Sequence, residues 1–222
     1  MKKVSFLLLL VTFAASAFAQ SDKYVNAMAP KVAAFDTTRS SDGLKDLSNS
    51  FERIADAEKT QWLPYYYAAL SQVMSGYMMP ELQGGGMASG LGDKIDPVAD
   101  KAEALLSKAE AMQKDNSEIY LVKKMIASLR MMADPMNRYM TYGPQAQEAL
   151  ETAKKLNPEN PRVYLLEGQD KFYTPEQYGG SKEEAKKLFE TAMQKYGAFK
   201  PKSSLDPAWG KQTTAYFMSQ AK

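Results

Sequence analysis

The sequence lacks two residue types altogether, because none of its 222 residues is histidine or cysteine. Ser-His-Asp and Cys-His catalytic arrangements and thiolate nucleophiles are therefore excluded. Zinc, copper(II) and haem sites that use imidazole or thiolate ligands are excluded too, and so are disulfide bonds. An enzyme would have to work with carboxylates, Lys, Tyr or Ser alone. We therefore predict a protein that is not an enzyme, with no catalytic residues, no metal site and no cofactor.

An excess of charge of one sign is also missing. The chain has 28 basic and 26 acidic side chains. Two of the basic residues, Lys2 and Lys3, lie in an N-terminal segment that we expect to be removed, which leaves 26 of each sign. A neutral chain of mixed charges lacks the basic surface that binds nucleic acid or an anionic membrane. We therefore predict no nucleic-acid partner.

Long apolar runs are scarce as well. The apolar stretch from Phe6 to Phe13 follows two lysines and precedes Ala17-Phe18-Ala19. This order is typical of a secretory signal peptide, so we predict that residues 1–19 are cleaved off after Ala19. The stretch is too short to span about 30 Å of hydrocarbon, and no run of roughly 20 apolar residues follows it. We predict no membrane span, and a mature protein (residues 20–222) that is periplasmic or secreted and has no cysteine for a lipid anchor.

What is present is a series of helix-forming segments. Residues 147–168, QEALETAKKLNPENPRVYLLEG, favour a helix up to Leu156, and Pro158 ends it. Asn160 can cap a second helix, whose first turn accommodates Pro161. Two helices joined this tightly lie antiparallel or nearly so. Similar start signals recur at Asp96-Pro97, Asp134-Pro135, Thr174-Pro175, Ser181 with Glu184, and Asp206-Pro207. No stretch alternates as a β-strand does, so we predict an all-α protein of about nine helices.

A small-large-small spacing of side chains recurs along the chain. It occurs at Ala146, Leu150 and Ala153, at Ala102, Leu106 and Ala109, and at Ala185, Phe189 and Ala192. With Pro158, Tyr164 and Gly168 after it, the first set resembles the second helix of a tetratricopeptide repeat and the start of the next repeat. Several stretches also resemble secreted tetratricopeptide-like proteins of Bacteroidota. The resemblance implies a right-handed stack of antiparallel helical hairpins that forms one domain over residues 20–222.

Three stretches exceed the length that such repeats need. They are the glycine-rich residues 79–95, MPELQGGGMASGLGDKI, and residues 134–144 and 173–180. We interpret them as insertions within hairpins, which would project on one side of the array. The segment DPAWGK, residues 206–211, is predicted to start the last helix. Its Trp209 would close the open end of the apolar stack.

The resemblance also implies a concave groove that holds peptide segments and is lined by the first helices of successive repeats. Carried onto this chain, it places Tyr66, Gln169 and Tyr173 on the groove, with Tyr65 and Tyr164 in the core. Aromatic residues with a polar tip suit such a surface, and packing between hairpins is the alternative. We predict a non-enzymatic scaffold that binds a protein or peptide partner, or a small ligand, on its concave face. The oligomeric state is left open.

Three other functions remain as alternatives. Helical-repeat proteins serve as accessory subunits of envelope transport systems, and this chain could do the same by analogy of fold. The 14 methionines could hold Cu(I) through their thioethers, for example at Met132 and Met136. A hydrolase could use a carboxylate pair such as Glu183 and Glu184. Lysines surround that pair, which favours a solvated helix face instead.

Overall fold

The computed structural model describes residues 22–83 and 89–221. The signal peptide and its cleavage site lie outside these residues. Within the described part of the chain all regular secondary structure is helical, which confirms the all-α prediction. None of the described helices is both long enough and apolar enough to cross a membrane.

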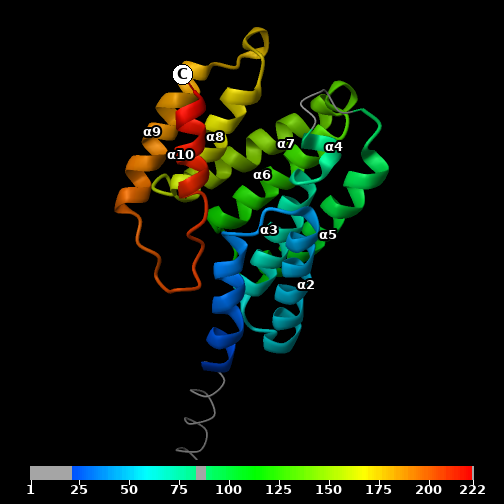
Figure 1. The fold of residues 1–222 in the computed structure, drawn as a ribbon, viewed down its shortest axis with the longest axis vertical. Coiled ribbons are helices and arrows are strands. Elements are labelled where there is room, and N and C mark those ends of the chain that lie inside the picture. Colours follow the sequence, from blue (N-terminus) through cyan, green and yellow to red (C-terminus); the bar gives the residue numbers. More distant parts are fainter. Residues whose placement is uncertain (1–21, 84–88, 222) are drawn as a thin grey trace, which may run out of the picture.

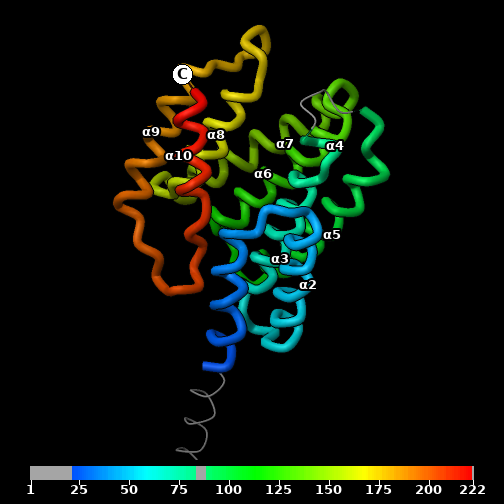
Figure 2. Tube along the Cα trace, viewed as in Figure 1, coloured from blue at the N-terminus to red at the C-terminus, as the bar shows by residue number. Residues whose placement is uncertain are grey.

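The helices follow one another with short connections (Figures 1 and 2). A first helical segment covers residues 22–35. The others are α2 (Ser41–Glu58), α3 (Trp62–Tyr77), α4 (Pro80–Gln83), α5 (Gly92–Met112), α6 (Ser117–Met132), α7 (Pro135–Leu156), α8 (Pro161–Tyr173), the 3-10 turn η1 (Glu176–Tyr178), α9 (Lys182–Ala198) and α10 (Lys211–Gln220). Successive helices pack as antiparallel pairs, most extensively α2 with α3, α6 with α7, and α8 with α9.

Local capping explains where several of these helices begin. The Asn160 side chain accepts a hydrogen bond from the backbone N–H of Arg162 at 3.1 Å, and Pro161 occupies the first turn of α8. The Ser181 hydroxyl accepts from the N–H of Glu184 at 3.1 Å and starts α9. Both caps were predicted, because short polar side chains satisfy the free N–H groups of a first helical turn.

The apolar residues form two clusters. The larger one gathers side chains from the first helical segment through α8, and the smaller one joins α8, α9 and α10 around Phe189 and Phe217. The predicted small-large-small positions on α5, α7 and α9 are all buried, and several of them are alanines, which let neighbouring helices approach closely. Among the described residues, Trp209 is the partly buried side chain that packs against both clusters.

One proline position agrees with the sequence prediction and one was misjudged. The helix start at Asp134-Pro135 is confirmed, since α7 begins at Pro135, but residues 134–144 are not an insertion, because α7 continues through Pro144. Pro135 fits the first helical turn, where no N–H is needed. Pro144 removes the N–H that would bond the carbonyl of Met140. Met140 is exposed, so water can take up that bond and the helix tolerates the proline.

Two helix starts also differ from the prediction. Helix α5 begins at Gly92 and contains Pro97 in its interior, because Asp96 binds Arg138 at 2.6 and 2.9 Å and does not cap a helix. The last helix begins at Lys211, and Asp206 instead closes a turn by accepting from the N–H of Lys202. The predicted insertion 79–95 contains α4 and the start of α5, and its residues 84–88 lie outside the described structure.

Candidate functional site

Exposed aromatic side chains gather at the C-terminal end of the array. Tyr173 ends α8 with 68% of its surface exposed, and Tyr216 on α10 is 60% exposed. Each stands edge-on to Phe217, with ring centroids 5.7 and 5.4 Å from it. Phe172 lies 5.5 Å from Phe217. We call Phe172, Tyr173, Tyr216 and Phe217 the aromatic cluster. The buried Phe217 and the half-buried Phe172 form a base on which the two tyrosine rings stand at the surface, a geometry that suits a flat apolar ligand.

The backbone between α8 and α9 places a further tyrosine near this end of the molecule. Helix α8 stops at Tyr173 because Pro175 disfavours a helical conformation in the residue before it. Tyr178 then lies in η1 and is 74% exposed. Gly179 has φ +91°, and a side chain on Gly180 would collide with the carbonyl oxygen of Thr174. The two glycines are therefore needed for the sharp turn that returns the chain to α9.

The electrostatics of the aromatic cluster favour neutral phenols. Partial burial, and to a lesser degree the neighbouring Tyr216, raise the pKa of Tyr173 above its ordinary value. The phenol therefore stays protonated at neutral pH and can donate a hydrogen bond. Two cations border the cluster. Lys182 has its Nζ 5.8 Å from the Phe172 ring, and Lys171 pairs with Glu184 at 2.7 Å. Lys182 can attract an anionic substituent of a ligand, whereas the charge of Lys171 is already balanced by Glu184.

The three residues predicted to line the groove have different environments. Tyr173 is exposed, and Gln169 lies four residues earlier on the same helix and is half-buried. Tyr66 has no exposed surface, which disagrees with a place on the groove wall. Its hydroxyl donates to Glu118 at 3.0 Å and accepts from Nε1 of Trp209 at 2.9 Å. Binding by Gln169 and Tyr173 stays a prediction, and Tyr66 can meet a ligand only if Trp209 moves.

Sequence reasoning missed the part of the cluster on α10. The signal is a repeated pair of adjacent aromatic residues, Phe172-Tyr173 at the end of α8 and Tyr216-Phe217 in α10. In each pair one ring is turned inward and the other faces solvent. The predicted helix containing Tyr216 was assigned only a capping role, so this pairing was not recognised.

A buried ionic centre lies at the start of α8, at the opposite end of the helix from Tyr173. Arg162 is 1% exposed, and its Nε donates to both carboxylate oxygens of Glu118, at 2.9 and 3.0 Å. Asn160 also donates to this carboxylate, at 2.6 Å. The guanidinium faces the rings of Phe199 and Trp209, at 4.8 and 5.7 Å. Burial by itself lowers the pKa of Arg162, but Glu118 outweighs it and raises the pKa above its ordinary value. We interpret the pair as structural, since Arg162 and Glu118 are both buried.

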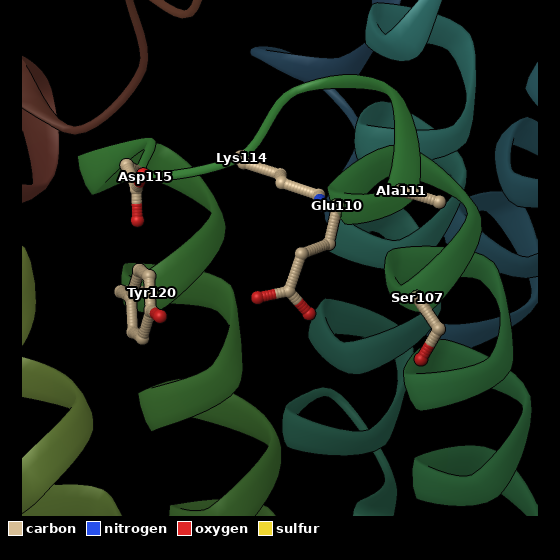
Figure 3. Close-up of a pocket in the computed structure, with 6 residues that line it drawn as sticks. All are labelled: Ser107, Glu110, Ala111, Lys114, Asp115 and Tyr120. Atoms are coloured by element: carbon tan, nitrogen blue, oxygen red, sulfur yellow. The ribbon is translucent and has the colours of Figure 1, made fainter.

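A surface depression of about 380 Å³ lies near the turn between α5 and α6 (Figure 3). It is lined by Ser107, Glu110, Ala111, Lys114, Asp115 and Tyr120. Figure 3 shows the Glu110 carboxylate projecting between the two helices. That carboxylate already pairs with Lys123 at 2.6 Å, and Lys123 also lies 4.7 Å from the Tyr120 ring. The polar lining of this depression and its paired charges make it a poor site for an apolar ligand.

A second exposed apolar group lies on the first half of α7. Met136 and Met140 are 78% and 81% exposed, and Tyr139 between them is 60% exposed. The two methionines are one helical turn apart and share a face. Met132, which the sequence paired with Met136, is in α6 and is half-buried. Among the described residues, no group of three acidic side chains is suited to a metal ion.

These observations define a class of protein: an all-α array of antiparallel helical hairpins with an exposed aromatic cluster at one end. No protein-family model matches the sequence, and no curated protein matches it. A solved structure does, the HusA haemophore from Porphyromonas gingivalis, with 33% sequence identity and a TM-score of 0.76. The match covers 90% of this chain and 92% of that one.

The chain belongs to the family of this HusA haemophore. The likeness supports the expectation of a helical protein of the Bacteroidota type. Membership of the tetratricopeptide family is not confirmed, because no family model matches.

Proposed function

We propose that the protein is a non-enzymatic binding protein for haem or a related porphyrin, and that the aromatic cluster is its binding surface. The observation that carries the proposal is the pair of exposed rings, Tyr173 and Tyr216, held edge-on to Phe217. The family relationship to a haemophore supports the choice of ligand. Flat aromatic ligands gain most of their affinity from apolar surface removed from water and from ring contacts.

The residues of this chain limit how such a ligand can be held. With no histidine and no cysteine, tyrosine and methionine are the usual haem ligands that remain. The raised pKa of Tyr173 works against the phenolate that would bind iron. The cluster therefore suits contact with the porphyrin ring, with Lys182 near enough to Phe172 to attract a carboxylate of its side chains.

Three further predictions from the sequence are part of this proposal: the location of the protein, a protein partner and the role of Gln169. The predicted N-terminal signal peptide is consistent with a periplasmic or secreted binding protein. A protein partner stays a prediction, either as the peptide-binding scaffold or as an accessory subunit of an envelope transport system. The Gln169 side chain, one turn before Tyr173 on α8, would lie at the edge of the bound ring.

The test is a titration of the purified protein with haem and, separately, with metal-free protoporphyrin, followed by the porphyrin absorbance. We expect both to bind with similar affinity, because the ring and not the iron is recognised. Tyr173→Ala and Tyr216→Ala should each weaken binding about tenfold, as expected when ring contacts and buried area are lost. Tyr173→Phe should bind like the wild type, because the ring is kept.

The chain offers a matched control. Tyr139 on α7 has the same 60% exposure as Tyr216 but lies outside the aromatic cluster, so Tyr139→Ala should leave the affinity unchanged. The proposal fails if neither porphyrin binds. It also fails if Tyr139→Ala weakens binding while the Tyr173 and Tyr216 variants do not, since the site would then lie on α7. Binding of haem alone, lost in Tyr173→Phe, would show iron ligation by the phenol.

A second candidate function is supported by the exposed thioethers of Met136 and Met140. Soft thioether ligands select Cu(I), and two of them one turn apart can reach the same ion. The test is a titration with Ag(I), which mimics Cu(I) and does not change oxidation state. Uptake should fall in Met136→Leu and Met140→Leu and persist in Met112→Leu, a methionine on α5 that is 40% exposed. Equal uptake by all variants would rule this site out.

A further inference from the structure

Helix α10 forms one wall of the proposed site, and few of its side chains are buried against the rest of the molecule. The helix has ten residues, of which only Thr214 and Phe217 are buried. Phe217 stacks on Phe189 of α9 at 5.6 Å and supports Tyr216. The contacts on either side of the helix therefore decide where the Tyr216 ring stands relative to Tyr173.

The start of α10 is fixed by Trp209. Its carbonyl oxygen accepts a hydrogen bond from the Tyr196 hydroxyl at 2.9 Å, and its Nε1 donates to Tyr66 at 2.9 Å. Gly210, the next residue, has φ +102°, and a side chain there would collide with the hydroxyl of Tyr196. Only glycine adopts this conformation without strain, so the direction in which α10 leaves Trp209 is set closely.

The Trp209 indole connects α10 to the buried ionic centre. Tyr66, which accepts its N–H, donates in turn to Glu118 at 3.0 Å, and Glu118 pairs with Arg162. Trp209 also packs against both apolar clusters. A position fixed by hydrogen bonds as well as by apolar contacts is better defined than one set by apolar packing alone, because hydrogen bonds are directional.

We propose that Trp209 is a positioning residue for the ligand site: its bond to Tyr66 sets the place of α10, and with it the spacing between Tyr173 and Tyr216. The inference rests on the proposed function, because the site whose geometry it controls is the aromatic cluster. Trp209 does not touch the ligand. It fixes one wall of the site against the core before the ligand arrives, which lowers the ordering cost of binding.

The test uses Trp209→Phe, which keeps an aromatic ring beside Arg162 and removes the N–H, and Tyr66→Phe, which removes the acceptor. Each should weaken the binding of metal-free protoporphyrin about fivefold, the affinity equivalent of one net hydrogen bond. The double variant should be no weaker than Tyr66→Phe, because that substitution already breaks the Trp209–Tyr66 bond and also removes the donor to Glu118. The circular dichroism induced in the bound porphyrin should also change, since it reports the orientation of the ring.

Trp62→Phe is the matched control. The Trp62 ring also stands against Tyr66, with centroids 5.5 Å apart, but it packs only within the larger cluster. Trp62→Phe should keep the wild-type affinity and the wild-type induced spectrum. Thermal unfolding of every variant shows whether a change in binding follows a general loss of stability.

The outcomes separate the two proposals. If the wild type binds no porphyrin, the proposed function fails. If the wild type binds and Tyr173→Ala weakens binding, while Trp209→Phe has the wild-type affinity and spectrum, the role of Trp209 is overturned. The same holds if Trp62→Phe and Trp209→Phe weaken binding equally, since general packing would then explain both. The positioning role of Trp209 is supported if Trp209→Phe and Tyr66→Phe weaken porphyrin binding, Trp62→Phe does not, and the effects of the first two are not additive.

Discussion

Two sets of tyrosines in this molecule have opposite environments. Tyr66, Tyr67 and Tyr196 are buried, and each hydroxyl donates to an internal acceptor. Tyr173 and Tyr216 expose more than half of their surface and rest on a phenylalanine base. In one region the tyrosine hydroxyls are hydrogen-bonded inside the protein, and in the other the exposed rings are available for the binding that we propose. The comparison shows that the environment of the side chain, rather than the residue type, separates the two sets.

The largest effect is expected from removing the carboxylate of Glu118, which accepts the hydrogen bond of the buried Tyr66. Glu118→Ala leaves the Arg162 guanidinium buried without its counter-ion. We expect a loss of about 3–5 kcal/mol in the free energy of unfolding, measured by urea denaturation. The exposed pair of Lys187 and Glu183 serves as control, and Glu183→Ala should cause no measurable change. A loss in Glu118→Ala as small as in Glu183→Ala would contradict the structural role of the ionic centre.

The packing beneath the aromatic cluster can be tested at a glycine of α8. A methyl group on Gly168 would lie 2.5 Å from a ring carbon of Phe189, so Gly168→Ala must displace a ring on which Phe217 stacks. We expect a destabilisation of about 1–3 kcal/mol by overpacking, together with weaker porphyrin binding. Gly197 in α9 has open space around it. Gly197→Ala should therefore leave stability unchanged or raise it by about 0.5–1 kcal/mol; equal losses in both would rule out the Phe189 contact.

Removing one hydroxyl from each set sharpens the comparison. Tyr67→Phe loses the 3.0 Å hydrogen bond to the carbonyl oxygen of Leu205, and leaves that oxygen with one donor fewer. It should lower the free energy of unfolding by about 1 kcal/mol. Tyr173→Phe should have no effect on stability, because its hydroxyl is at an exposed position. A larger loss in Tyr173→Phe than in Tyr67→Phe would reverse the assignment of the two tyrosines.

The last expected effect concerns the pH dependence of stability and is confined to alkaline pH. Burial, and then Glu58 and Asp206, raise the pKa of Tyr24 to about 12. A group with a raised pKa in the folded state stabilises it fully below its unfolded pKa, near 10, and loses that contribution as pH rises toward 12. Stability should therefore fall over that range, and Tyr24→Phe should make the fall shallower. An unchanged slope in Tyr24→Phe would show that Tyr24 does not contribute.

Local features of the fold could be predicted from the sequence. The caps at Asn160 and Ser181 and the small-large-small stripes depend on neighbours a few residues apart, and they are where the sequence places them. The helix start at Asp134-Pro135 was predicted, because Pro135 suits a first helical turn. The continuation of α7 through residues 134–144 was not predicted, although Pro144 lies at an exposed position.

The candidate site could be predicted only in part. The sequence identified Tyr173 but not Tyr216. Tyr216 comes near Tyr173 only because residues of α8 and α10 meet in the folded protein. Tyr66 was placed on the surface because the sequence does not show that Trp209, 143 residues further on, covers it. Contacts at such separation come from the tertiary packing and not from local periodicity.

The most direct measurement is carbon-13 NMR of the protein with labelled tyrosines, before and after addition of metal-free protoporphyrin. The ring current of a bound porphyrin shifts nearby resonances strongly. The account predicts large shifts for Tyr173 and Tyr216, assigned by substitution to Phe, and small ones for Tyr66 and Tyr67. Large shifts confined to Tyr139, or to the buried tyrosines, would contradict the claim that the exposed aromatic cluster is the ligand site.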